Sequence, residues 1–311
     1  MKEKIICRVL TGPTASGKSA LGLELAEKHG WDILCMDSMQ IYRRMDIGTA
    51  KPTEADRKRV RHEMLDICEP DESFSVAMYQ EMAARLIREK GKDGRPVLLV
   101  GGTGLYLQAL MHPMGLGRIP ANEALREELR QLAATPEGKK ALHDRLTALD
   151  PAAAARLPEN DVRRIIRAIE VTLGTGIPFS AQPRVERETE FEWRAVALRL
   201  PRDVLYPRIN RRVEEMIHQG LPEEVRALLS EGLSPEAQSM QGLGYKEMIP
   251  FLRGDWPLEK TVEEIQKGSR HYAKRQETFL KREPCLKWLD PLATDALSRA
   301  EALLAAGSIR K

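Results

Sequence analysis

Apolar and polar positions alternate with two different periods along the N-terminal third of the chain. Short apolar runs lie near residues 5–10, 32–37, 64–68 and 97–101, and helical periodicity lies near residues 18–29 and 75–90. Strands that alternate with helices in this order are typical of a parallel sheet with helices on both faces. The pattern therefore predicts an α/β fold for this part of the chain.

This alternation stops after Tyr106. From about residue 114 to residue 194 the sequence is poor in strand signals, and helical periodicity covers residues 121–134, 138–149 and 161–173. The third segment is the clearest, because its apolar residues repeat at i, i+3, i+4 and i+7. A strand-like run at residues 195–200 then resumes the sheet pattern.

The simplest organisation is a helical domain inserted into an α/β core. We predict a core formed by residues 1–114 and 195–311, with the insertion at residues 115–194. The second part of the core is mostly helical and includes a long helix from about Pro257 to Arg282. The 311 residues are enough for about two domains of this kind.

A phosphate-binding signature lies between the first predicted strand and the first predicted helix. The loop reads Gly12, Pro13, Thr14, Ala15, Ser16, Gly17, Lys18 and Ser19, which fits G-x-x-x-x-G-K-[ST]. In this setting, backbone N–H groups and the helix N-terminus converge on an anion. Lys18 can reach the terminal phosphate and the Ser19 hydroxyl can bind Mg²⁺. The sequence therefore predicts a P-loop that binds a diphosphate or triphosphate.

The acidic residue that P-loop nucleotidases carry on a second strand is missing. The apolar run at residues 96–100 continues into Gly-Gly-Thr-Gly without a carboxylate, although Thr103 offers a hydroxyl there. The strand predicted at residues 33–37 is the one that ends in an acid, Asp37, at the sheet edge where such folds bind ligands. From the residues alone, Asp37 is a metal ligand, a general base, or a structural acid that caps the next turn.

Composition describes an ordinary globular protein, 42% hydrophobic and 31% charged. No apolar stretch approaches the ~20 residues that a membrane span requires, and the N-terminus shows no signal-peptide core. The four cysteines and six histidines lack the spacing of a zinc site, and the cysteines are widely separated. We expect a cytoplasmic protein with buried, reduced thiols and no membrane association.

The net charge of +3 does not by itself indicate nucleic acid, but basic residues gather near residues 57–61, 163–167, 208–212 and 270–282. Arg163, Arg164 and Arg167 project from the polar face of a helix that Asn160 or Asp161 is placed to cap. An RNA backbone would neutralise them. The long C-terminal helix carries Lys274 and Arg275, with Tyr272 and Phe279 on its apolar side. For each cluster, a solvated helix face is the alternative interpretation.

Six stretches carry a resemblance to a known family. They are the P-loop, the very distinctive residues 37–52, the Gly-Gly-Thr-Gly-Leu-Tyr run at residues 101–106, and the motifs at residues 160–167, 241–247 and 272–276. Together they resemble the bacterial tRNA dimethylallyltransferases over essentially the whole chain. Arg44 stands where that family usually has glycine, and Phe279 where it usually has tryptophan. The zinc finger of eukaryotic members has no counterpart in this sequence.

The resemblance implies transfer of a dimethylallyl group from dimethylallyl diphosphate to N6 of adenosine-37 in tRNAs that read codons beginning with U. The P-loop would then hold a diphosphate leaving group with Mg²⁺ at Ser19, while Lys18, Arg212 and Thr103 stabilise it and Asp37 acts as the base. The implied contacts with the anticodon stem-loop are Asp37, Ser38, Met39, Gln40, Thr103, Arg126, Arg163, Arg164, Arg167, Lys274 and Arg275. We expect a monomer.

Three alternatives remain at this stage. A P-loop kinase for a small metabolite would share the fold, and turnover of ATP without RNA would support it. A prenyltransferase for a free adenine nucleotide would share the chemistry, but would not need the insertion. An RNA-binding module with a vestigial P-loop would not bind diphosphate.

Overall fold

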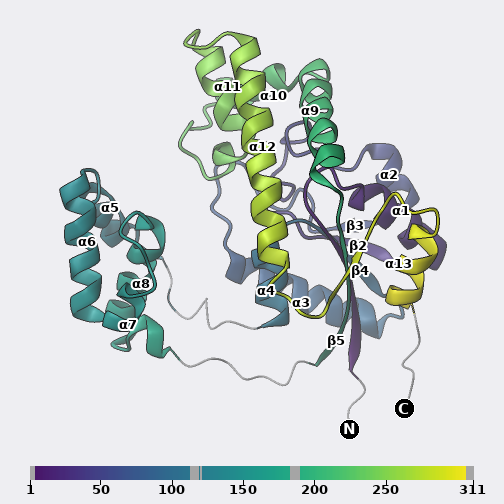
Figure 1. The fold of residues 1–311 in the computed structure, drawn as a ribbon, viewed down its shortest axis with the longest axis horizontal. Helices are drawn as coiled ribbons and strands as arrows, with labels where there is room; N and C mark the ends of the chain where they lie inside the picture. The colour runs from purple at the N-terminus through teal and green to yellow at the C-terminus, as the bar shows by residue number, and fades with distance from the viewer. Residues whose placement is uncertain (1–3, 113–118, 120, 183–189, 306–311) are drawn as a thin grey trace. The chain divides into compact units, whose positions relative to one another are not determined.

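The computed structural model describes residues 4–112, 119, 121–182 and 190–305 (Figure 1). The chain divides into two compact units, residues 1–112 with 188–311, and residues 113–187. The sequence predicted the same division with the boundaries at residues 114/115 and 194/195. The second segment of the larger unit begins earlier than the predicted residue 195, because strand β5 begins at Phe191.

The core of the larger unit is a six-stranded parallel sheet in the order β3-β2-β4-β1-β5-β6. The strands are β1 (Ile5–Thr11), β2 (Asp32–Cys35), β3 (His62–Glu63), β4 (Val97–Gly101), β5 (Phe191–Leu198) and β6 (Leu286–Leu289). In the central strands Thr11 pairs with Gly101 on one side and with Ala197 on the other, so three strands end together. The predicted α/β fold is confirmed.

Helices cover both faces of this sheet. Successive strand residues point to opposite sides, and those on both sides are apolar, so each face packs against helices. Leu10, Leu98 and Val196 pack with α1 (Lys18–His29) and α13 (Ala296–Ala305). Val9, Leu99 and Ala197 belong to the other cluster, which includes α3 (Val76–Lys92) and α4 (Gly104–Met111). Buried aliphatic and aromatic side chains fill both layers, which gives the sheet edge a rigid base.

The remaining helices of this unit follow β5, apart from the short α2 (Glu54–Arg59). They are α9 (Arg202–His218), α10 (Leu221–Ser230), η2 (Ser239–Gln241), α11 (Tyr245–Leu252) and α12 (Leu258–Leu280). The long helix α12 packs beside α9 and reaches α4 (Figure 1). It matches the predicted helix closely.

Three expectations about this unit were wrong. The strand predicted at residues 64–68 is absent: β3 is only His62–Glu63, since Met64 and Asp66 adopt positive φ angles of 63° and 53° that no strand accommodates. Strand β2 ends at Cys35, so Asp37 lies in the following turn. Cys285 is exposed, whereas the other three thiols are buried as expected.

The smaller unit is helical. It contains α5 (Glu123–Leu132), α6 (Pro136–Leu149), α7 (Pro151–Ala154), α8 (Val162–Thr175) and η1 (Phe179–Ala181), around a core that includes Leu129, Leu142 and Ile169. Local sequence sets the helix starts, because Asn122 and Thr135 accept capping hydrogen bonds from Leu125 and Gly138 N–H groups. Asp161 occupies the N-cap of α8 as predicted, but its side chain makes no capping hydrogen bond.

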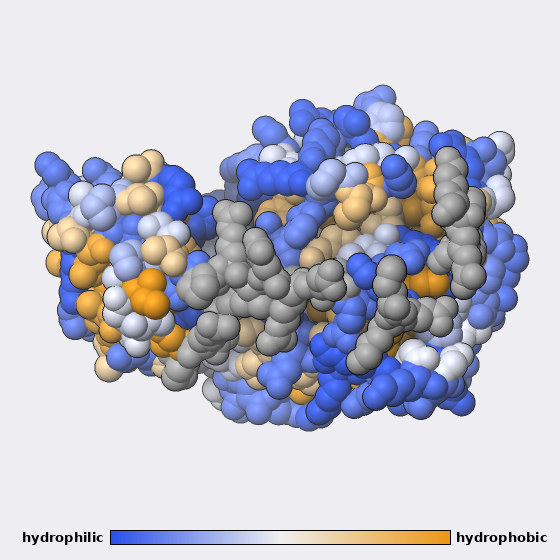
Figure 2. Space-filling view, turned by 90° about the horizontal axis from the view of Figure 1, so that it is seen from below, coloured by the Kyte–Doolittle hydropathy of each residue, from blue (hydrophilic) through white to orange (hydrophobic). Residues whose placement is uncertain are grey.

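Exposed apolar side chains are interspersed with hydrophilic ones on both units (Figure 2). On the smaller unit they include Leu173 and Ile177. Among the helices that the structure describes, none combines the length and apolarity needed to cross a membrane.

Candidate active site

The phosphate loop connects β1 to α1 through two glycines with positive φ angles. Gly12 has φ 144°, and a Cβ atom there would lie 2.9 Å from the Leu198 carbonyl oxygen. Gly17, with φ 92°, leads directly into α1. Its successors Lys18 and Ser19 begin the helix, where backbone N–H groups have no helical partner. These amides and the helix dipole therefore form an anion site.

Two other amides of the loop are already used inside the protein. The Thr14 N–H donates to Gln276 Oε1 at 2.9 Å, and the Ser16 N–H donates to the Pro13 carbonyl at 3.3 Å. The sequence motif predicted a phosphate role for the whole loop, Pro13 to Ser19 included. In the structure its first half is held by protein contacts, and its second half, Gly17 to Ser19, offers N–H groups that donate to no described residue.

Two half-buried cations converge on the loop. The pKa of Lys18 is lowered to about 8, chiefly by burial and then by the positive charge of Arg212, while the Asp37 carboxylate opposes the shift. Burial also lowers the pKa of Arg212, and Asp37 again acts in the opposite direction. The structure thus brings Lys18, Arg212 and Asp37 together as predicted. A bound polyanion would relieve the repulsion between the two cations.

Arg208 is a cation that the sequence analysis did not single out for the site. It lies on α9 one turn before Arg212, and its Nη2 is 3.7 Å from the position of a Cβ atom on Gly17. Among the described residues it has no ion-pair partner. Its i, i+4 spacing from Arg212 was visible in the sequence, and it places both guanidinium groups on one helix face.

Ser19 fits a magnesium site supported by phosphate. Its side chain is exposed in the first turn of α1 and makes no hydrogen bond to any described residue. Within the described part of the chain, no group of three or more acidic, histidine or cysteine side chains is arranged to hold a metal. A Mg²⁺ ion at Ser19 would therefore take its other ligands from phosphate oxygens and water, which this ion commonly retains.

Asp37 lies two residues beyond β2, opposite the loop that follows β4. Its Oδ1 accepts a hydrogen bond from the Met39 N–H at 2.9 Å, so the capping role left open by the sequence is real. The other oxygen, Oδ2, accepts no hydrogen bond from the described residues and is available for a proton. The carboxylate is thus oriented by the turn and is still able to act as a base.

Thr103 joins this site from the other side. Its Oγ1 accepts the Ser38 N–H at 3.0 Å, and its own N–H donates to the Met36 carbonyl at 3.2 Å. Tyr272 of α12 hydrogen-bonds to Thr103, and its pKa is raised by burial and by the Asp37 charge. Segments from three distant parts of the sequence therefore meet at one sheet edge.

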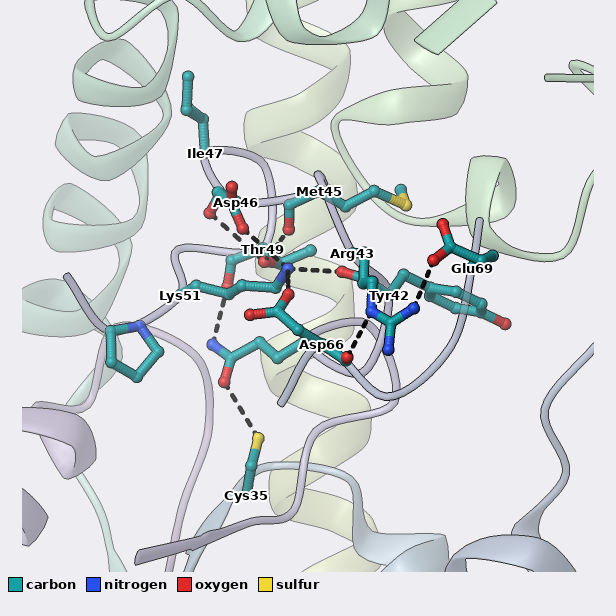
Figure 3. A network of polar contacts seen from close by, with 12 residues as sticks. Cys35, Tyr42, Arg43, Met45, Asp46, Ile47, Thr49, Lys51, Asp66 and Glu69 are labelled. Carbon is teal, nitrogen blue, oxygen red and sulfur yellow. Dashed lines mark hydrogen bonds and ion pairs between the residues drawn. The ribbon is translucent and has the colours of Figure 1, made fainter. Parts of the chain in front are cut away.

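The distinctive segment at residues 37–52 is held by a buried lysine (Figure 3). The Lys51 ammonium donates to the Tyr42 carbonyl, to Asp46 at 2.8 Å and to Asp66 at 2.6 Å. Gln40 Nε2 donates to the carbonyls of Thr49 and Ala50, and its Oε1 accepts from the Cys35 thiol. The Gln40 amide is thus fully used within the protein, and its predicted contact with RNA stays a prediction.

A second anchor of this segment was not predicted. The Glu224 carboxylate of α10 accepts the N–H groups of Asp46, Ile47 and Gly48 and the Tyr245 hydroxyl. A Cβ atom on Gly48 would lie 2.5 Å from the Tyr245 ring, so this position requires glycine. Gly48 and Tyr245 thus join the motifs at residues 37–52 and 241–247 in space.

Two departures from the family pattern have local explanations. Arg44 adopts φ 61°, the left-handed conformation that glycine accepts without strain, and its guanidinium pairs with Glu69 and Glu231. Phe279 lies against Gly104, where a Cβ atom would be 2.4 Å from the ring. The loop therefore forms with arginine in place of glycine, and Phe279 packs within the protein.

The predicted RNA contacts of the larger unit lie on two surfaces. Ser38 and Met39 are half-buried next to Asp37, with Met39 packed against Gly242. Lys274 and Arg275 are exposed on α12, and the Arg275 guanidinium lies 5.8 Å from the centre of the Tyr272 ring. Tyr272 therefore connects the helix that carries these exposed basic groups with the turn that carries Asp37.

The four predicted RNA contacts of the smaller unit are of two kinds. Arg126 pairs with Glu170 at 2.8 Å and Arg167 also pairs with it, and this carboxylate is 1% exposed. Arg163 and Arg164 are exposed, and Arg164 lies 3.3 Å from Asp161. Arg126 and Arg167 thus stabilise the unit, and Arg163 and Arg164 are the ones presented to solvent.

Comparison with known proteins identifies relatives over nearly the whole chain. A family model described as IPP transferase matches residues 40–283. A tRNA dimethylallyltransferase of Pelotomaculum thermopropionicum is 46% identical over 93% of this chain and 91% of its own length. Another from Geobacillus thermodenitrificans is also 46% identical, over the same shares of both chains.

Solved structures agree with these matches. The tRNA isopentenylpyrophosphate transferase of Bacillus halodurans is 39% identical, with a TM-score of 0.69 over 97% of this chain and 100% of that protein. A eukaryotic dimethylallyltransferase acting on tRNA has a TM-score of 0.78 at 25% identity, over 95% of this chain and 77% of its own.

Proposed function

This chain belongs to the IPP transferase family, whose relatives described above are tRNA dimethylallyltransferases, and we propose that it transfers a dimethylallyl group from dimethylallyl diphosphate to N6 of adenosine-37 in tRNAs that read codons beginning with U. Diphosphate is the leaving group. The observation that carries the proposal is the placement of Asp37 beside the cations of the phosphate loop. A base and an anion site at one sheet edge suit a reaction that removes a proton and releases diphosphate.

The phosphate loop supplies the electrophilic half of this reaction. As the allylic C–O bond breaks, negative charge develops on the diphosphate and positive charge on the carbon. Lys18, Arg212 and the N–H groups at the start of α1 face that negative charge from fixed positions, so they stabilise the transition state without reorganising. Mg²⁺ bound at Ser19 would add Lewis-acid stabilisation of the leaving group. Arg208 extends the same cationic surface.

The turn after β2 supplies the nucleophilic half. The exocyclic amine of adenine is a weak nucleophile and must lose a proton as its new N–C bond forms. Asp37 Oδ2 accepts that proton, while the Met39 N–H holds Oδ1 and fixes the direction of the carboxylate. Thr103 and Ser38 position the turn. The target base must leave its stack to reach this edge of the sheet.

The missing hydrolytic acid supports a prenyl donor over a nucleotide donor. Strand β4 is followed by Gly102 and Thr103, with no carboxylate to hold a metal for phosphoanhydride cleavage. A kinase would need such a residue. A transferase that releases intact diphosphate does not need one.

We assign the RNA to exposed basic groups on both units. Arg163 and Arg164 on the smaller unit, and Lys274 and Arg275 on α12, bind phosphates of the anticodon stem-loop. Ser38, Met39 and Thr103 contact the bases beside adenosine-37. The protein acts as a monomer in the cytoplasm, where its tRNA substrate is found.

Mass spectrometry of tRNA nucleosides tests the proposal. Bulk unmodified tRNA is incubated with the protein, Mg²⁺ and dimethylallyl diphosphate, then digested to nucleosides. We expect N6-dimethylallyladenosine to appear, and to be lost when Lys18→Ala replaces the wild type. Dimethylallylation of free AMP in place of tRNA would instead support the mononucleotide alternative, and unmodified RNA would contradict the proposed function.

A further inference from the structure

The side chain of Gln276 joins two loops of the active site. Its Oε1 accepts the Thr14 N–H of the phosphate loop at 2.9 Å, and its Nε2 donates to the Gly102 carbonyl after β4 at 2.9 Å. Gln276 is 6% exposed, so neither bond exchanges readily with water. A single amide therefore spans the gap between the loop that holds the diphosphate and the turn that carries Thr103.

The backbone packs tightly around the Gln276 side-chain amide. A Cβ atom on Gly102 would lie 2.3 Å from Gln276 Nε2 and 3.1 Å from the Gly12 carbonyl oxygen. Gly102 thus allows α12 to approach both loops at once. A buried amide with both ends satisfied is rigid, because loss of either bond leaves an unpaired polar group in the interior.

The same helix also reaches the base side of the reaction. Tyr272, one turn before Gln276, hydrogen-bonds to Thr103, and the Asp37 charge raises its pKa. Lys274 and Arg275, on the exposed side of the same turn, are proposed RNA contacts. Helix α12 therefore links three things: the phosphate loop through Gln276, the Asp37–Thr103 turn through Tyr272, and the solvent face that receives RNA.

We propose that Gln276 is a positioning residue for dimethylallyl transfer, which sets the phosphate loop and the Thr103 turn at the spacing that aligns the diphosphate with the attacking amine. This inference rests on the proposed function for its catalytic consequence. Gln276 itself touches neither substrate: it acts through the Thr14 N–H and the Gly102 carbonyl. A misplacement of about 1 Å between reacting groups costs roughly 10²-fold in rate, so the effect falls on kcat more than on the KM for tRNA.

The substitution Gln276→Glu provides a test with an internal switch. An ionised carboxylate can accept from Thr14 but repels the Gly102 carbonyl, whereas a protonated carboxyl offers one donor and one acceptor and restores both bonds. Burial raises the pKa of a carboxyl group. We therefore expect the kcat of Gln276→Glu, divided by that of wild type at the same pH, to rise about tenfold or more between about pH 8 and about pH 6.

Two controls separate positioning from folding. Gln266→Glu makes the same change on the same helix, at a side chain whose contacts are with Asn210 and Glu214 at α9, and its ratio to wild type should not depend on pH. Gln276→Met keeps the length without hydrogen bonds, so it should be impaired at every pH. Far-UV circular dichroism at the assay temperature gives the folded fraction of each variant.

Binding of inorganic pyrophosphate gives a readout that does not depend on prenyl transfer. Its affinity, relative to wild type at each pH, should fall several-fold in Gln276→Met and recover at low pH in Gln276→Glu. A wild type that binds pyrophosphate but transfers no dimethylallyl group would overturn the proposed function. In that case the pyrophosphate affinities of the variants would still test whether Gln276 positions the phosphate loop. The inference is overturned if both Gln276 variants match wild type, if the Gln276→Glu ratios are independent of pH, or if activity and affinity follow the folded fraction.

Discussion

The two units both contain clustered arginines, yet they balance the charge in different ways. In the smaller unit Arg126 and Arg167 surround Glu170, which also accepts the Asn122 N–H, and Arg126 pairs with Glu123 as well, so the positive charge is neutralised inside the protein. At the phosphate loop Lys18 and Arg212 are half-buried, and Asp37 is the acid that lowers the cost of both charges. A cluster with an internal counter-charge stabilises a fold, whereas a cluster left with excess positive charge is prepared for an anion.

The largest effect expected from this comparison concerns the single acid of the catalytic cluster. Asp37→Asn keeps the shape of the side chain and its hydrogen bond from Met39, but removes the proton acceptor. We expect kcat to fall by about 10²–10⁴, with little change in tRNA binding. Single-turnover kinetics at saturating RNA would measure this, and a nearly normal rate would reduce Asp37 to the cap of its turn.

The excess positive charge at the phosphate loop should make diphosphate binding depend on pH. The lowered pKa of Lys18, about 8, means that its charge is lost as the pH rises through that value in the empty site. Pyrophosphate affinity should therefore decline above about pH 8 in the wild type. Lys18→Arg keeps its charge throughout, so its affinity should decline less. Equal slopes for the two proteins in calorimetric titrations would show that Lys18 does not bear the charge that matters.

The neutralised cluster should respond in stability instead. Burial acts to raise the pKa of Glu170, but hydrogen bonds from Arg126, Asn122 and Arg167 outweigh it and lower the pKa. The resulting stabilisation is complete above the pKa of the unfolded chain, about 4.3, and is lost as the pH falls through the lower folded value. Glu170→Gln removes the buried carboxylate that pairs with both Arg126 and Arg167 and should cost about 3–5 kcal/mol.

Thermal denaturation followed at neutral and acid pH would measure that loss. Glu123→Gln is the matched control, because Glu123 pairs with Arg126 from an exposed position. It should cost no more than about 1 kcal/mol. If both variants were equally stable, the buried carboxylate would not be the element that holds this unit together.

The smallest expected effect distinguishes the exposed arginines from the paired ones. Changing Arg163 and Arg164 to Gln should flatten the slope of log K against log salt by about 1.4–1.8, since each neutralised phosphate contributes about 0.7–0.9. The fold should be unaffected. Binding titrations with tRNA at several salt concentrations would measure this slope. An unchanged slope would show that Arg163 and Arg164 lie on a solvated helix face and do not contact RNA phosphates.

Features that depend on interactions between neighbouring residues could be predicted from the sequence. Hydrophobic periodicity and capping are local, so the parallel sheet, the inserted helices and the long α12 were all predictable. The apolar run at residues 64–68 misled because Met64 and Asp66 adopt positive φ angles, which no periodicity reveals. The motif around Lys18 indicated an anion site, but not that Gln276 holds the Thr14 amide.

The remaining features of the site could not be predicted, because they depend on contacts between residues far apart in the sequence. Arg126 and Glu170 are far apart in the sequence, so nothing local indicated that a presumed RNA contact is tied to a buried acid. The same holds for the Glu224 clamp on Gly48 and for the contact of Tyr272 with Thr103. In each case the residue type suggested a charge or a hydrogen bond, and only the fold shows its partner.

The most direct test of the account follows donor and phosphate in one reaction. Wild-type protein, Mg²⁺, tRNA, dimethylallyl diphosphate and ATP are mixed, and RNA prenylation and ATP hydrolysis are measured together. Because the phosphate loop lacks a hydrolytic acid and faces Asp37, we predict dimethylallylation of adenosine-37 with negligible release of phosphate from ATP. Rapid ATP hydrolysis stimulated by RNA, with no prenylated nucleoside, would contradict the account and identify the protein as a nucleotidase.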